Sequence, residues 1–144
     1  MRVIGFLLLA MAGVAVAQAP DYKPVGSMSE LMIRIIYPAS DALFYIERDP
    51  PKTDVQWNNM RSQALMLAES GNLMIMPNRA RDQGDWIKES KVMIDLAAEA
   101  YRAALAKNID GIVAVNDKLA DSCIVCHQQY RANYPKRPVQ SQQK

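Results

Sequence analysis

The chain has 144 residues, of which half are hydrophobic and 22% are charged, and its formal net charge is +2. These values are typical of one compact domain and exclude a disordered or fibrous chain. The charges nearly balance, so there is no overall field that would attract nucleic acid or an anionic membrane, and we expect neither as a partner.

Residues 1–17 have the pattern of a secretory signal peptide. Arg2 gives a positive start, an apolar stretch follows, and Ala15 and Ala17 form an A-x-A cleavage pattern before Gln18. A buried first helix or a membrane anchor is the alternative, but the apolar run is shorter than the ~20 residues that span a bilayer. Cleavage predicts a periplasmic protein with 16 basic and 15 acidic residues and no membrane span.

After an extension at 18–26, the first helix begins at a capping box formed by Ser27 and Glu30. Pro38 removes one helical hydrogen bond and predicts a bend, and the helix stops before Pro50. Apolar residues recur along it at helical spacing. They are Met28, Leu31, Met32, Ile35, Ile36, Ala39, Leu43 and Ile46.

Three further amphipathic segments follow. The first starts at a capping box of Thr53 and Gln56. The expected ranges are 53–76, 82–108 and 110–134. Four helices with short connections predict an all-α fold, an antiparallel up-down-up-down four-helix bundle over 27–134. The polar tail at 135–144 is expected to be solvated, with docking of its basic residues to a partner as the alternative.

The last helix carries both cysteines and the only histidine, as Cys123-x-x-Cys126-His127. A thioredoxin-type site belongs at a helix start, where the helix dipole lowers the thiolate pKa, whereas this motif lies late in a helix. A structural zinc site needs four ligands, and only three stand here. Two buried cysteines beside a surface histidine is the purely structural alternative.

The same motif is the signature of covalent haem attachment. Cys123 and Cys126 lie within one helical turn and can form thioethers to the two vinyl groups of a haem. His127, next in sequence, can supply an axial nitrogen to the iron. The sequence therefore favours one covalent haem c, held in an exported protein.

The chain resembles the class II cytochromes c, which comprise cytochrome c′ and its low-spin relatives of the c-556 type. The likeness rests on a four-helix bundle with the haem motif near the C-terminus, and on Tyr130 and Arg131 after the haem histidine. Pro38 and Met28 depart from the pattern. The resemblance implies a non-enzymatic carrier of single electrons between redox partner proteins, or a c′-type protein that binds nitric oxide or carbon monoxide, and leaves open whether two bundles dimerise.

Because His127 is the only histidine, the sixth iron ligand must be a methionine, an unusual ligand or nothing. Bundle topology puts four methionines at the haem end: Met28, Met32, Met74 and Met76. Met60 is expected to be remote from the haem, and Met66 and Met93 are expected at intermediate distances. Met32 lies on the inward stripe, at the position where c-556-type relatives carry their ligand, and we expect it to bind iron. Core packing is the alternative for each.

Two other side chains are expected at this end. Trp86 is expected to be an aromatic anchor of the core rather than part of an electron path. Arg131, one turn beyond the histidine, is a candidate partner for a haem propionate, with a solvated arginine as the alternative. If the sixth site is vacant, the sequence predicts that Leu31, Met32 and Ile35 line it.

Overall fold

The computed structural model describes residues 22–134 and is all-helical over that range, with no strand. The expected signal peptide at 1–17 and the polar tail at 135–144 lie outside the described residues. Between residues 22 and 134, none of the helices combines the length and the hydropathy that a membrane span requires.

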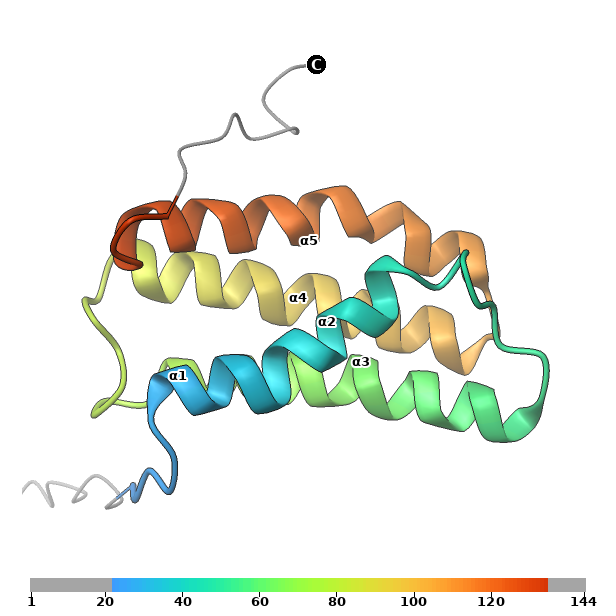
Figure 1. Cartoon of the computed structure of the whole chain (residues 1–144), viewed down its shortest axis with the longest axis horizontal. Helices are drawn as coiled ribbons and strands as arrows, with labels where there is room; N and C mark the ends of the chain where they lie inside the picture. Colours follow the sequence, from blue (N-terminus) through green and yellow to red (C-terminus); the bar gives the residue numbers. More distant parts are fainter. Residues whose placement is uncertain (1–21, 135–144) are drawn as a thin grey trace, which may run out of the picture.

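One interrupted helix and three long helices form the bundle. The interrupted helix consists of α1 (Met28–Leu31), the π-helical segment η1 (Met32–Ile36) and α2 (Tyr37–Phe44). The long helices are α3 (Asp54–Met74), α4 (Asp85–Leu105) and α5 (Ile109–Tyr130). The interrupted helix, α3, α4 and α5 run in alternating directions, and α4 packs along both α3 and α5 (Figure 1). The predicted up-down-up-down bundle is confirmed.

Both predicted capping boxes are present. The Glu30 amide donates to Ser27 Oγ at 3.2 Å, and the Gln56 amide donates to Thr53 Oγ1 at 3.3 Å. The side chains of Glu30 and Gln56 accept in return from the amides of Ser27 and Thr53. Each helix therefore begins where its own residues satisfy the free amides of the first turn.

The bend expected at Pro38 takes the form of a π-helical turn. In η1 the Tyr37 amide donates to the Met32 carbonyl, five residues earlier. The break puts Pro38 in the first turn of α2, where a missing amide hydrogen costs least. A π turn holds more residues than an α turn, so it offsets the apolar face around it by about one position.

All three long helices end before their predicted limits. α3 ends at Met74 rather than Met76, and α4 ends at Leu105 rather than Asn108. In the second case Lys107 has a φ of 53°, a left-handed conformation that cannot continue a right-handed helix.

α5 ends at Tyr130, four residues before the predicted limit at Tyr134. Arg131 has extended backbone angles, with φ −104° and ψ 117°, and Asn133 is left-handed with φ 60°. The chain therefore turns away from the helix axis just after the motif and brings Tyr134 back over His127.

Gly71 allows α3 and α4 to approach closely beside the motif end of the bundle. A Cβ atom at Gly71 would lie 2.3 Å from Cγ1 of Ile94 and 3.2 Å from Cε of Met93. We expect Gly71→Val to lower the free energy of unfolding by about 1–3 kcal/mol, because the helices must separate to accept the side chain. Denaturant unfolding measures the change. Asn59→Val, on the exposed side of the same helix, should be close to neutral, and equal losses in both variants would contradict this packing.

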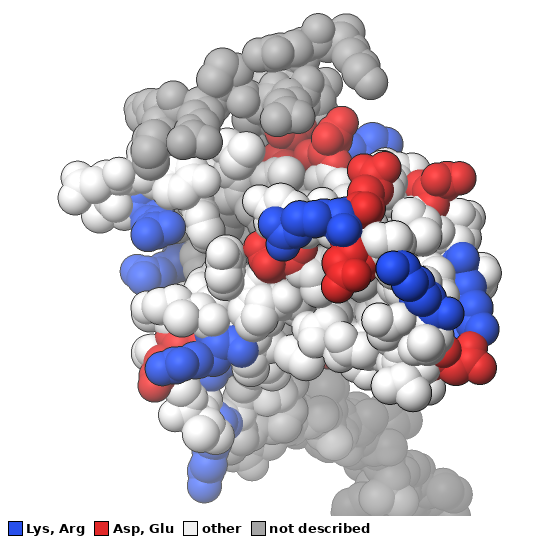
Figure 2. Space-filling model, turned by 45° about the vertical axis from the view of Figure 1, so that its right-hand side comes forward, with Lys and Arg blue, Asp and Glu red and all other residues white. Residues whose placement is uncertain are grey.

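Charges are mixed on the part of the surface that Figure 2 presents. Blue Lys and Arg side chains alternate with red Asp and Glu side chains there, and neither sign forms a continuous field. This face agrees with the near-neutral composition of the chain.

Candidate functional site

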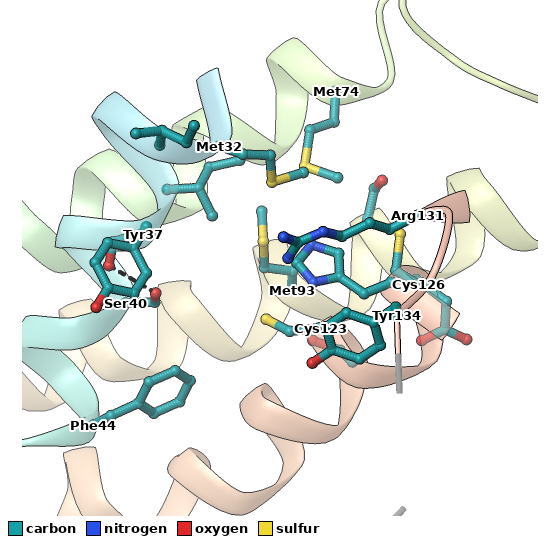
Figure 3. Close-up of a pocket in the computed structure, with 16 residues that line it drawn as sticks. Met32, Tyr37, Ser40, Phe44, Met74, Met93, Cys123, Cys126, Arg131 and Tyr134 are labelled. Atoms are coloured by element: carbon teal, nitrogen blue, oxygen red, sulfur yellow. Dashed lines mark hydrogen bonds between the residues drawn. The ribbon is translucent and has the colours of Figure 1, made fainter. Parts of the chain in front are cut away.

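A cavity of about 300 Å³, here the first cavity, lies at the end of the bundle that carries the Cys-x-x-Cys-His motif. Its walls come from η1, α2, α3, α4 and α5, and Figure 3 shows the labelled side chains converging on it from these elements. Six of the lining residues are large and apolar: Met32, Ile33, Ile36, Phe44, Met74 and Met93.

A second cavity of about 290 Å³ adjoins the first. The two share five lining residues: Met32, Ile33, Cys126, His127 and Arg131. The two cavities therefore lie next to each other around His127. Each volume is at the lower end of the ~300–1,000 Å³ typical of sites for small molecules and cofactors.

The serine hydroxyls in the first cavity have partners within their own helices. Ser40, Ser90 and Ser122 each donate to a backbone carbonyl three or four residues earlier, at 3.0, 2.7 and 2.8 Å. They do not need a polar ligand, and the other polar groups of the wall belong to the motif, Glu89, Arg131 and the hydroxyls of Tyr37 and Tyr134. Glu89 is itself paired, 3.5 Å from the Lys88 ammonium.

Both cysteines are free thiols in the last turns of α5, and both line the first cavity. Burial raises the pKa of the Cys123 thiol. Burial, with the negative charges of Cys123, Glu89 and Asp82 adding to it, raises the pKa of Cys126 to about 11. Thiols used in disulfide exchange have lowered pKa values, so this pair does not match that chemistry.

His127 lines both cavities, beside the two thiols. Burial, together with the positive charge of Arg131, lowers the pKa of its imidazole. A lowered pKa favours the neutral ring, which is the form that coordinates a metal. Tyr134 packs edge-on against it, with ring centroids 5.2 Å apart, and the Arg131 guanidinium lies 5.7 Å from the Tyr134 ring centroid.

The methionines expected at this end of the bundle line three different cavities. Met32 and Met74 line the first, together with Met93, which the sequence placed at an intermediate position (Figure 3). Met28 lines the second cavity. Met76 lines a third cavity of about 340 Å³, on the other side of the first helix. Met32 is the only one of these five that borders both of the cavities next to His127.

Two residues expected beside Met32 lie elsewhere. Leu31 and Ile35 line the third cavity, whereas Ile33 and Ile36 line the first. The side of the helix that Met32 shares with Ile33 and Ile36 faces the motif, and the side that carries Leu31 and Ile35 faces the third cavity.

Trp86 is 3% exposed and anchors the core at this end, as the sequence favoured. Its Nε1–H donates to the Met74 carbonyl at 2.9 Å, and its ring meets Tyr130 edge-on with centroids 5.0 Å apart. The Tyr130 hydroxyl in turn donates to the Asp82 carboxylate. These contacts join the end of α5 to the connection between α3 and α4.

Comparison of the chain with family models, with curated proteins and with solved structures gave no match. Among residues 22–134, no group of three or more His, Cys, Asp or Glu side chains is arranged to hold a metal ion.

Proposed function

We propose that the protein is a c-type cytochrome that holds one haem through thioethers at Cys123 and Cys126, with His127 as an axial iron ligand. One observation carries this proposal: both thiols and the imidazole of His127 line one largely apolar cavity at the end of the bundle. The residues present fit such a group. The two thiols can react with its two vinyl groups, the imidazole can bind its iron, and the apolar part of the wall can pack against its ring. When bound, the haem supplies a one-electron ferric–ferrous couple.

The chain's own residues hold and shield the group. Met32 is proposed as the second axial ligand, because it borders the same two cavities as His127. The apolar part of the wall would limit the access of water to the iron, and the bundle would hold both ligands on rigid elements. Such a protein carries single electrons between redox partner proteins and requires no substrate chemistry. Export to the periplasm remains part of the proposal and rests on the pattern at 1–17.

The second candidate is a c′-type haem protein with a vacant sixth site that binds nitric oxide or carbon monoxide. The observation in its favour is the half-buried position of Met32, because a side chain that is not fully enclosed is not held at a single position next to His127. Much of the wall around His127 is apolar, which suits a small uncharged gas.

Carbon monoxide binding distinguishes the two. With Met32 bound to iron, ferrous protein should take up carbon monoxide slowly or incompletely, because the internal ligand must leave first. Stopped-flow mixing and optical spectra of the oxidised, reduced and carbon monoxide-treated protein measure this. Fast and complete binding, with a high-spin resting spectrum, would favour the vacant site.

A further inference from the structure

The second cavity differs from the first in its charge. Two guanidinium groups line it, Arg81 from the connection between α3 and α4 and Arg131 from the end of α5. No carboxylate lines it, and most of its remaining wall is apolar, including Met28, Ile33 and Trp86. A site of this kind suits a ligand with an apolar body and a negatively charged edge.

Neither guanidinium has a carboxylate partner among the described residues. The nearby acids are engaged with other groups. Asp82 accepts from the Tyr130 hydroxyl and from the amides of Gly84 and Trp86, and Glu89 pairs with Lys88. The positive charge in this cavity is therefore available to a ligand.

The position of Arg81 is fixed by its neighbour in sequence. Asp82 holds the connection in place through the Gly84 amide at 2.8 Å and the Trp86 amide at 3.2 Å. Its bond from Tyr130 ties the same connection to α5, three residues after His127. Arg81 is thus presented beside the motif on a constrained backbone, which lowers the entropic cost of ordering it against a ligand.

We propose that Arg81 and Arg131 form a dibasic cradle for the two propionate carboxylates of the haem, with Arg81 as the anchor from outside α5. This inference rests on the proposed function, since it assumes that a haem is bound. Arg81 acts as a positioning residue: it orients the carboxylate edge toward the second cavity and offsets its negative charge near the iron.

The test compares Arg81→Gln, Arg81→Lys and Arg102→Gln in the haem-containing protein. Arg102 is exposed on α4 and lines neither cavity, so its variant controls for the loss of one positive charge. Arg81→Gln should shift the propionate bending band in the resonance Raman spectrum. It should also lower the reduction potential, because an unpaired propionate favours ferric iron. We expect the redox equilibrium constant to change by about threefold to tenfold, and a tenfold change corresponds to about 59 mV for one electron. Arg81→Lys should recover part of both changes.

The outcomes separate the two proposals. A protein without covalent haem would contradict the proposed function before any variant is compared. If haem is attached and Arg81→Gln matches Arg102→Gln in both the Raman band and the potential, the cradle is wrong while the cytochrome stands. A double Arg81→Gln, Arg131→Gln variant whose Raman band shifts further than in Arg81→Gln alone supports the cradle, and a double variant identical to Arg81→Gln would remove Arg131 from it.

Discussion

Replacing Met32 with alanine is expected to convert the haem iron from low spin to high spin while the bundle stays folded. A thioether is a soft ligand that stabilises ferrous iron, so its loss should also lower the reduction potential. The far-red sulfur-to-iron charge-transfer band should disappear, and carbon monoxide should bind readily. Because Met32 is half-buried, the stability cost should be about 1–3 kcal/mol. Optical spectra and a redox titration measure these changes.

Three other methionines supply the controls. Met60 is buried in α3 but lines neither cavity beside His127, so Met60→Ala should lower stability without changing the spectrum. Met74→Ala and Met93→Ala remove the other thioethers of the first cavity. Loss of the low-spin spectrum in one of these, with a normal spectrum in Met32→Ala, would show that another methionine is the ligand. A native spectrum in all three cavity variants and in Met28→Ala, which removes a thioether of the second cavity, would mean that the sixth site is vacant.

The double variant Cys123→Ala, Cys126→Ala is expected to lose all covalently attached haem. Both thiols line the first cavity, and no other cysteine exists in the chain to replace them. Extraction with acidified organic solvent measures the loss, since it removes haem that is held only through its iron. Ser122→Ala, at a buried position in the same turn of α5, should keep its haem. Retention of extraction-resistant haem by the double variant would exclude thioether attachment.

The starts of the helices could be predicted because they depend on local chemistry. Ser27 and Thr53 each satisfy amides within three residues, and this pattern is visible in the sequence alone. The ends of α4 and α5 could not be predicted in the same way. α4 ends beside a left-handed Lys107, a residue type that gives no signal for a positive φ. α5 ends where Arg131 takes extended backbone angles, two residues before the left-handed Asn133, and an arginine gives no signal for such an ending.

The candidate site was only partly predictable. Motif spacing and bundle topology were enough to predict that Met32 lies at the same end of the bundle as His127. The π turn was not foreseen, because Pro38 signals a disturbance of the helix without specifying its form. Ile33 and Ile36, rather than Leu31 and Ile35, line the first cavity beside Met32.

The positions of Arg81 and Tyr134 could not be predicted from the sequence either. Both lie outside helices, where no periodicity indicates which way a side chain faces. Arg81 reaches the second cavity because contacts of Asp82 with Tyr130 position its loop, and Tyr134 reaches His127 because α5 ends early. Tertiary contacts of this kind are not encoded in local sequence patterns.

The mass of the denatured protein, produced in a host with a c-type maturation system and stripped of non-covalent ligands, tests the central claim most directly. The account predicts a mass that exceeds the polypeptide mass by one haem, with the added mass on the peptide that contains Cys123 and Cys126. A polypeptide of unmodified mass, with its haem recovered in the solvent or absent altogether, would contradict it.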